Sequence, residues 1–197
     1  MRDGLLIRWR GAGEALEWLR IEGGRVGFVQ REQAPPAAVL TKAARIAVLV
    51  PGEDVLSIGL DLPARKADAA RKAAAFAAEE QVAAPIESVQ VALGESAHDG
   101  RWPCAVMARP KLAALSADLA RRGIVADAIH ADAACLPIGR ALRGPDGRVL
   151  VRLDRERALA CDDVLWPRVA RGGELAAPEQ IDECLPELAR GLAAAAP

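Results

Sequence analysis

Residues 48–94 constrain the fold of this chain more than any other stretch. Two apolar runs, Arg45–Val50 and Val55–Leu60, are separated by a Pro-Gly turn, and an alanine-rich segment over 66–83 follows them. Alanine is the best helix former, and apolar runs bounded by turn residues are typical of strands. The stretch therefore predicts strand, turn, strand, helix and strand, the last over 88–93, which is the alternation of an α/β protein.

The first fifty residues predict a β-β-β-α-β unit. Gly23 and Gly24 form a two-residue hairpin turn, and Pro35 opens a short helix at a position where its missing N–H does no harm. This order is that of one ribonuclease-H-like half of an actin-like fold. The expected strands cover 5–10, 15–21, 25–30 and 45–50, and the expected helix covers 35–42.

The next eighty residues predict β-α-β-β-α-β, the order of a split ferredoxin-like module. Pro110 begins the second helix, and Gly123 ends it at the position where helices often need a left-handed residue. The expected strands cover 55–60, 88–93, 101–108 and 124–129, and the expected helices cover 66–83 and 110–122.

The remainder of the chain predicts part of a second lobe. Residues 131–143 form a helical or irregular bridge that Pro137 breaks, and Arg143–Gly147 is a turn. A last helix is expected from about residue 178. The expected strands cover 149–153 and 158–161, with a further short strand around Leu165–Trp166.

We therefore predict an α/β (α+β) chain with a degenerate actin-like (ribonuclease-H-like) fold and an inserted ferredoxin-like βαββαβ module. The first lobe is expected over 1–50, with 131–145 as a bridge. The inserted module is expected over 51–130, and a partial second ribonuclease-H-like lobe over 146–197.

Charge and apolar composition exclude several classes of function. The chain has 26 basic and 27 acidic residues, so we expect neither nucleic-acid binding nor contact of this region with a membrane surface. No apolar run reaches the roughly eighteen residues of a membrane helix. The four cysteines contain no C-x-x-C pair; we expect buried free thiols, although their spacing alone does not exclude disulfides.

Catalytic and metal-binding motifs are absent from the sequence. His98 and His130 have no partner at metal-ligand spacing, and neither G-x-S-x-G, nor a P-loop, nor G-x-G-x-x-G after a strand is present. Glu79 and Glu80 are adjacent, so on a helix they point about 100° apart and do not converge on one substrate atom. We predict no enzyme activity, no cofactor and no metal.

Three short motifs resemble one protein family. They are L-V-P-G-E-D-V-L (49–56), L-P-A-R (62–65) and A-E-E-Q-V (78–82), and they are similar to type II secretion system protein L. The resemblance implies a non-enzymatic scaffold at the cytoplasmic face of the bacterial inner membrane, with a single membrane helix in the full-length protein. The implied partners are the amino-terminal domain of the secretion ATPase (GspE-type), other platform proteins (GspM-type and GspF-type) and a second copy of the chain.

Nucleotide-binding members of the actin-like superfamily hold phosphates with two glycine-rich hairpins, each preceded by an aspartate. The candidates here begin at Asp3 and at Asp154, and leucine, arginine and glutamate side chains follow where small residues are needed. These side chains keep backbone N–H groups away from a phosphate, so both hairpins are expected to be unable to bind ATP. The alternatives are an actin-like type IV pilus assembly protein that binds ATP, and an unrelated actin-like kinase.

The helix over 66–83 supplies the candidate partner-binding residues Arg71, Lys72, Glu79 and Glu80. The two glutamates lie in its last turn, which is the reverse of what the helix dipole favours. Two interpretations stay open: a solvated helix end, or an acidic surface that meets arginines of a partner. Phe76 is expected in the core, because it is the only bulky side chain of an alanine-lined helix.

Overall fold

The computed structural model describes residues 3–62, 67–94, 100–173 and 175–194. Its first sheet has six strands in the order β3-β2-β1-β5-β9, with β4 paired to β2. β1 and β2 are antiparallel, whereas β1, β5 and β9 are parallel to one another. The strands are β1 (Gly4–Arg8), β2 (Leu16–Glu22), β3 (Arg25–Val26), β4 (Gln30–Glu32), β5 (Ile46–Val50) and β9 (Ala128–Ala131).

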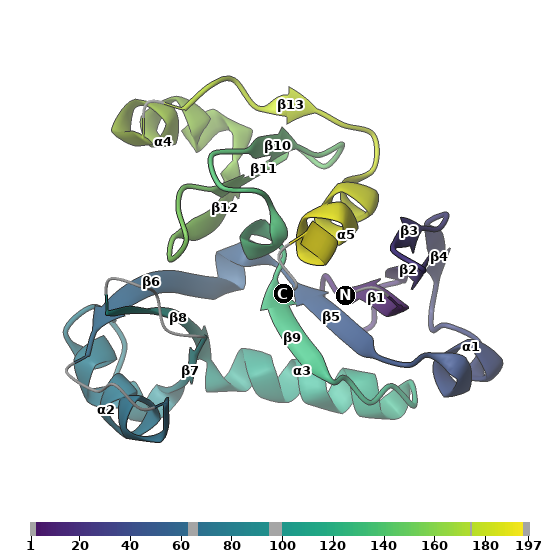
Figure 1. The fold of residues 1–197 in the computed structure, drawn as a ribbon, viewed down its shortest axis with the longest axis horizontal. Helices are drawn as coiled ribbons and strands as arrows, with labels where there is room; N and C mark the ends of the chain where they lie inside the picture. Colours follow the sequence, from purple (N-terminus) through teal and green to yellow (C-terminus); the bar gives the residue numbers. More distant parts are fainter. Residues whose placement is uncertain (1–2, 63–66, 95–99, 174, 195–197) are drawn as a thin grey trace.

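Helices cover both faces of the first sheet, which explains why β5 is buried at every position. α1 (Ala37–Lys42) and α3 (Arg109–Arg121) lie on one face, and α5 (Cys184–Ala194) lies on the other (Figure 1). In β1, Leu5 and Ile7 belong to the cluster on the α3 side, whereas Leu6 belongs to the cluster on the α5 side. The strand therefore uses both faces of its pleat for the core.

A second sheet repeats the pattern of the first. β10, β11 and β12 form an antiparallel meander, and β13 is parallel to β10, as β5 is parallel to β1. α4 (Trp166–Gly173) covers the outer face of this sheet through Trp166. An actin-like fold requires such a repeat. The strands are β10 (Ala141–Arg143), β11 (Arg148–Arg152), β12 (Ala158–Asp162) and β13 (Glu179–Gln180).

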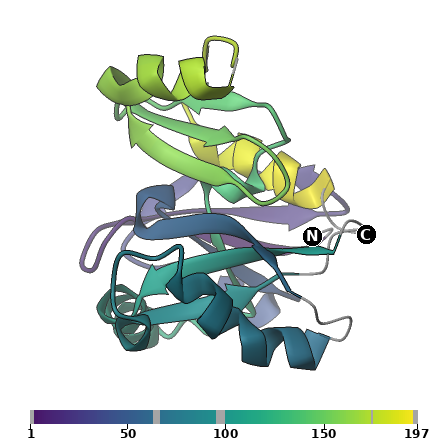
Figure 2. The ribbon, with the colours of Figure 1, turned by 90° about the vertical axis from the view of Figure 1, so that its left-hand side faces the viewer.

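α5 lies between the two sheets and joins them through one core (Figure 2). Its Leu188 is fully buried in a cluster that contains Leu19 from the first sheet and Leu142 from the second. Each side chain of this size contributes roughly 1.5–3 kcal/mol when it is fully buried. The two sheets are therefore held together by apolar packing rather than by a linker alone.

A third, smaller sheet has the strand order β6-β8-β7, and α2 (Ala67–Glu79) covers one of its faces (Figure 1). Trp102, Cys104 and Val106 alternate along β8 and face α2. Figure 2 shows α2 and α4 at opposite ends of the molecule. The strands are β6 (Val55–Asp61), β7 (Val89–Leu93) and β8 (Arg101–Ala108).

The fourth strand expected in this small module lies in the first sheet instead. The sequence predicted it over 124–129, but the strand is β9 at Ala128–Ala131, and it pairs with β5. α3 leads back to the first sheet, where Leu115 and Leu119 are buried. Apolar alternation identifies a strand but does not identify its neighbours, so the sequence did not assign β9 to its sheet. The domain boundaries stay predictions.

Two further strand predictions were wrong in detail. The run over 25–30 is interrupted between β3 and β4, where the N–H of Gly27 donates to the carbonyl of Arg20 at 2.8 Å. A Cβ at Gly27 would lie 3.1 Å from that carbonyl oxygen, so the close approach favours glycine. The segment at Leu165–Trp166 is helical rather than extended, because Trp166 begins α4 and packs into the second sheet.

The connection to the second lobe also differs from the prediction. The bridge over 131–143 contains a 3-10 helix, Ala133–Cys135, and ends in β10. The last helix begins at Cys184 rather than near residue 178, because the edge strand β13 comes first.

All four cysteines are buried and free, which confirms the expectation for the thiols. Burial raises the pKa of Cys104 to about 11 and that of Cys135 to about 12. At pH 8 about one Cys104 in a thousand is then a thiolate, the form that reacts. We expect the native chain to leave a disulfide reagent such as DTNB unreduced for hours at pH 8, and the urea-unfolded chain to release four equivalents. If one thiol of the native chain reacts rapidly with DTNB, the burial of that thiol is contradicted.

Candidate partner-binding surface

Three of the four predicted partner-binding residues lie on α2, whose inner side is set by alanines. The fourth, Glu80, directly follows the helix, which ends at Glu79 rather than at the predicted residue 83. Ala70, Ala74 and Ala78 are spaced one turn apart and are buried against the small sheet. Their small side chains let the helix lie close to the strands. Because successive residues of a helix are about 100° apart, the opposite face carries Lys72, Phe76 and Glu79.

Phe76 lies on this outer face, so its assignment to the core was wrong. Its side chain is 83% exposed. The prediction took bulk as a sign of burial, but the small sheet has room only for the row of alanines, and Phe76 points nearly opposite to that row. The core under α2 is supplied by the strands, mainly by Trp102, Leu60 and Val106.

The charged residues of α2 differ in their pairing. Arg71 Nη1 lies 2.8 Å from Asp68 Oδ1 across one helical turn, and both side chains are well exposed. Such an exposed pair contributes about 0.3–0.5 kcal/mol. Lys72, Glu79 and Glu80 are exposed and have no ion pair with any residue that the structure describes. The two glutamates therefore keep their carboxylates free at the end of the helix.

The two lobes meet at a pocket of about 200 Å³. The β1–β2 turn, which holds Arg10 and Glu14, borders it on one side, and the β10–β11 turn, which holds Asp146, borders it on the other. These turns contain glycines at 11, 13, 144 and 147. The remaining lining residues are Arg8, Pro51, Glu53, Asp132, Arg148 and Leu150.

Ion pairs close this interlobe pocket. Arg10 pairs with Asp146, and Arg148 pairs with Glu53, so these bonds tie the β10–β11 hairpin to the β1–β2 turn and to the 3-10 helix Gly52–Asp54. Partial burial would raise the pKa of Asp146, but hydrogen bonds from the Arg10 side chain and the Arg148 backbone hold it below its ordinary value. The pocket is smaller than the roughly 300–1,000 Å³ of most ligand sites.

Beside these pairs, Arg8 and Asp132 form a buried ion pair. Arg8 Nη2 lies 2.8 Å from Asp132 Oδ2, and the two side chains are 5% and 1% exposed. Asp132 Oδ1 also accepts the backbone N–H groups of Gly52 at 2.9 Å and Ala133 at 2.7 Å. Burial would lower the pKa of Arg8, but the Asp132 carboxylate outweighs this and raises it. The pair fixes the end of β9 against β1.

Neither Asp3 nor Asp154, the aspartates of the two predicted hairpins, lines the interlobe pocket. Asp3 lies at the opposite end of β1 from the pocket, where its Oδ1 accepts the N–H of Gly23 at 2.7 Å. Asp154 caps its own turn by accepting the N–H groups of Glu156 and Arg157. The sequence missed Arg10 and Asp146; the G-P-D-G turn at 144–147 was noticed only as a boundary and could have pointed to them.

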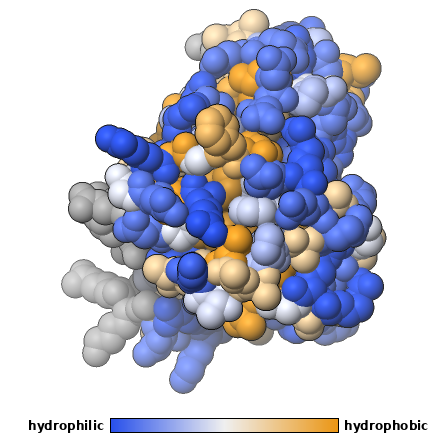
Figure 3. Space-filling view, turned by 90° about the vertical axis from the view of Figure 1, so that its right-hand side faces the viewer, coloured by the Kyte–Doolittle hydropathy of each residue, from blue (hydrophilic) through white to orange (hydrophobic). Residues whose placement is uncertain are grey.

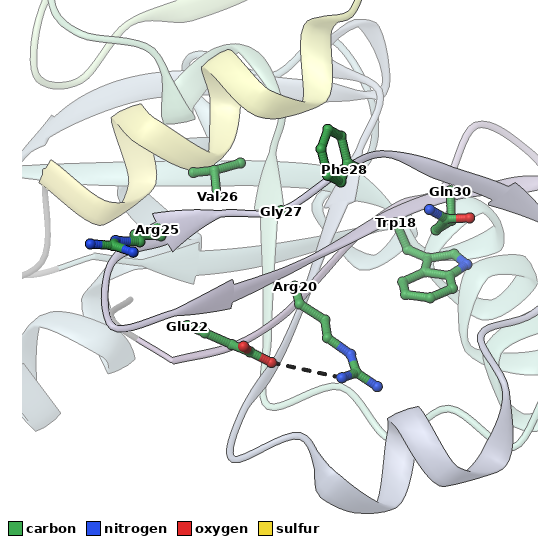
Figure 4. A pocket seen from close by; sticks show the side chains of 8 residues that line it. All are labelled: Trp18, Arg20, Glu22, Arg25, Val26, Gly27, Phe28 and Gln30. Carbon is green, nitrogen blue, oxygen red and sulfur yellow. Dashed lines mark ion pairs between the residues drawn. The ribbon is translucent and has the colours of Figure 1, made fainter.

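A second hollow lies along the outer edge of the first sheet. It is a groove of about 600 Å³, and Phe28, which is 92% exposed, stands at its rim (Figure 4). Trp18, Arg20 and Glu22 project into it from alternate positions of β2, and Arg20 pairs with Glu22. Figure 3 shows hydrophobic side chains among charged ones on this side of the molecule.

Comparison with known proteins identifies the family. The sequence profile of type II secretion system protein L matches residues 5–191. The chain belongs to the type II secretion system protein L family. The curated protein L of Pseudomonas aeruginosa PAO1 is 35% identical over 119 residues, which is 60% of this chain and 31% of that protein. The matched part is thus about a third of the relative's length. Membership of this family makes the chain a component of the type II secretion system.

Solved structures confirm the α/β fold class. The cytoplasmic domain of EpsL, an inner-membrane component of the type II secretion system of Vibrio cholerae, matches with a TM-score of 0.72 at 14% identity, over 98% of this chain and 96% of that one. A PilM–PilN type IV pilus biogenesis complex matches with a TM-score of 0.57 at 15% identity, over 88% of this chain and 66% of that one. At these identities the likeness concerns the fold alone.

The part of the chain that the structure describes shows neither a membrane-spanning helix nor a metal-ligand cluster. No helix there is long and apolar enough to cross a membrane. No group of three or more His, Cys, Asp or Glu side chains is placed there to hold a metal ion.

Proposed function

We propose that this chain is a non-enzymatic scaffold at the cytoplasmic face of the bacterial inner membrane. Its role is to recruit the secretion ATPase (GspE-type) through the acidic end of α2. The proposal combines family membership with one observation, the free carboxylates of Glu79 and Glu80 on an exposed helix end. Carboxylates without an internal partner are suited to arginines of another protein, which bind them in a bidentate manner.

The other parts of the proposal follow from the family. The full-length protein carries a membrane helix outside this region, and it contacts GspM-type and GspF-type platform proteins. Arg71 and Lys72 form the basic side of the same helix and orient the partner. Electrostatic complementarity of this kind affects association rate and specificity more than it affects affinity.

The test is binding of the amino-terminal domain of the cognate ATPase, measured by calorimetry. We expect a Glu79→Lys, Glu80→Lys variant to bind at least about tenfold more weakly, because like charges then face each other across the interface. A matched control is Glu32→Lys, Asp182→Lys, whose residues are exposed and far from α2. Both variants change the formal net charge from −1 to +3.

The control separates a local effect from a general one. If both variants lose binding equally, net charge rather than the α2 surface is responsible. If neither loses binding, the acidic end of α2 is not the ATPase site. If the wild-type chain does not bind the ATPase domain at all, the recruiting function itself is wrong.

A further inference from the structure

The groove along the outer edge of the first sheet is built on a β-bulge. β2 pairs with β3 as far as Ile21 and Val26, and its pairing with β4 begins at Trp18 and Gln30. Between these two pairs β2 has two residues, whereas the opposite strand has three, at 27–29. An extra residue of this kind defines a bulge, which bends the strand and turns one side chain out of the regular alternation.

The side chain that the bulge turns out is Phe28. In a regular strand, positions two apart share a face, so Phe28 would join Val26 in the core. Because of the extra residue, Val29 packs there beside Val26, and Phe28 is 92% exposed. Proteins usually protect a free sheet edge with charge or proline, and an aromatic ring placed there does the opposite.

The groove beside this ring has the size and the chemistry of a binding site. Its volume is about 600 Å³, within the range of ligand sites, and Gly27 lines it without a side chain that would fill it (Figure 4). Trp18 also lines it, and its buried Nε1 has no hydrogen-bond partner among the residues that the structure describes. Buried indole N–H groups usually have one, so an acceptor that a ligand brings against Trp18 would complete this bonding.

The main chain along the groove is available for pairing. The N–H of Gly27 donates to the carbonyl of Arg20 at 2.8 Å, so it faces β2. Because the main-chain groups of a strand alternate in direction, those of Val26 face away from β2, toward the edge. In the part of the chain that the structure describes, no strand lies outside β3 or β4. Such an edge can accept an extended peptide as an added strand.

The charges at the groove favour an acidic ligand. Two arginines and one glutamate line it. Arg20 pairs with Glu22 at 3.7 Å, whereas Arg25 is exposed and has no ion pair with any residue that the structure describes. One positive charge is therefore uncompensated. A free guanidinium is suited to a carboxylate, which it binds in a bidentate manner.

We propose that this edge binds an extended acidic peptide of another protein, as an added strand beside β3. The main chain of the peptide pairs with Val26, a carboxylate binds Arg25, and an apolar side chain packs between Phe28 and Trp18. The groove and α2 lie on opposite sides of the molecule (Figure 1), so this peptide and the ATPase domain do not compete for one surface.

The test is an NMR titration of the ¹⁵N-labelled chain with a pool of capped heptapeptides. In this pool aspartate or glutamate alternates with leucine, valine or phenylalanine. We expect shifts of the amide signals of residues 25–30 and of the indole N–H signal of Trp18. A pool with lysine in place of the acidic residues is the charge control, and is expected to bind at least about tenfold more weakly.

Two pairs of variants connect the binding with the groove. Arg25→Glu and Phe28→Ala are each expected to weaken the binding of the acidic pool about tenfold or more, because they remove the cation and the ring. Arg168→Glu in α4 and Phe76→Ala in α2 make the same changes elsewhere and are expected to leave it unchanged. All four positions are exposed, so these variants are expected to keep the wild-type thermal midpoint.

N-methylated peptides test the main-chain pairing. The strongest binder of the pool is N-methylated at alternate residues, in the two possible sets. Because only alternate N–H groups of an added strand face its neighbour, one set is expected to lose binding at least about tenfold and the other to keep it. Equal binding of the two sets would show that the peptide does not add a strand.

Three results would overturn the proposal as a whole. The first is the absence of shifts with the acidic pool at millimolar concentration, and the second is equal binding of the basic pool. The third is that the shifts lie outside residues 18–30. None of these results bears on ATPase recruitment, which is measured with the ATPase domain and with variants at the end of α2.

Discussion

The variant Asp132→Ala is expected to lose about 3–5 kcal/mol of folding free energy, because it removes the closer partner of the buried Arg8 charge and leaves only Glu17, 3.7 Å away. Arg8 is 4% exposed, so water does not replace the carboxylate. The N–H groups of Gly52 and Ala133 lose their acceptor at the same time. Urea unfolding followed by tryptophan fluorescence measures the loss as a shift of the midpoint.

Two controls identify the cause of that loss. Asp68→Ala removes the exposed pair with Arg71 and is expected to cost less than about 1 kcal/mol. Arg8→Met, Asp132→Leu removes both charges, so it is expected to be more stable than Asp132→Ala alone. A loss below about 1 kcal/mol for Asp132→Ala would mean that Glu17 or solvent compensates the Arg8 charge in the folded chain.

The sequence predicted the strands and helices of residues 45–122 well because their signals are local. Alanine runs, Pro110 at a helix start and Gly123 at its end act within a few residues. β6, β7, β8 and α3 were expected within about two residues of their ends, which is the usual uncertainty of element boundaries, whereas α2 ends at Glu79, four residues before the predicted end.

What the sequence could not predict depends on contacts between distant residues. The pairing of β9 with β5 joins residues about eighty positions apart, and the pairing of Arg8 with Asp132 joins residues 124 apart. The hydrophobic periodicity of a short segment carries no information on such contacts. The prediction that Phe76 is buried was wrong for a different reason. The alanines form the side of α2 that packs against the small sheet, and the sequence did not identify them as the packing side.

The candidate site was partly predictable. The sequence placed Arg71, Lys72, Glu79 and Glu80 on one helix; the structure has the first three on α2, has Glu80 directly after its end, and exposes all four. Their function as a partner surface stays a prediction. Asp3 and Asp154 did not predict the interlobe pocket. One of the two turns that border it follows β10, and β10 was not among the predicted strands.

The variant Gly191→Ala is expected to destabilise the chain by about 3 kcal/mol or more, against the usual preference for alanine in helices. A Cβ at Gly191 would lie 1.9 Å from the carbonyl oxygen of Cys135, which is fixed backbone and cannot turn aside. α5 must therefore move away from the 3-10 helix Ala133–Cys135. Gly172→Ala in α4, where a Cβ meets nothing within 4 Å, is the matched control and is expected to stabilise by up to about 1 kcal/mol.

The position of α5 determines how Gly191→Ala unfolds. Because Leu185 and Leu188 are buried in a cluster with side chains of both large sheets, a displaced α5 weakens both lobes together. We therefore expect the urea midpoint to fall while the slope of the transition stays unchanged. A lower slope, with the second lobe separating first, would show that the lobes are only loosely coupled through α5. If Gly191→Ala is instead more stable than the wild-type chain, the carbonyl of Cys135 leaves room for a methyl group at position 191.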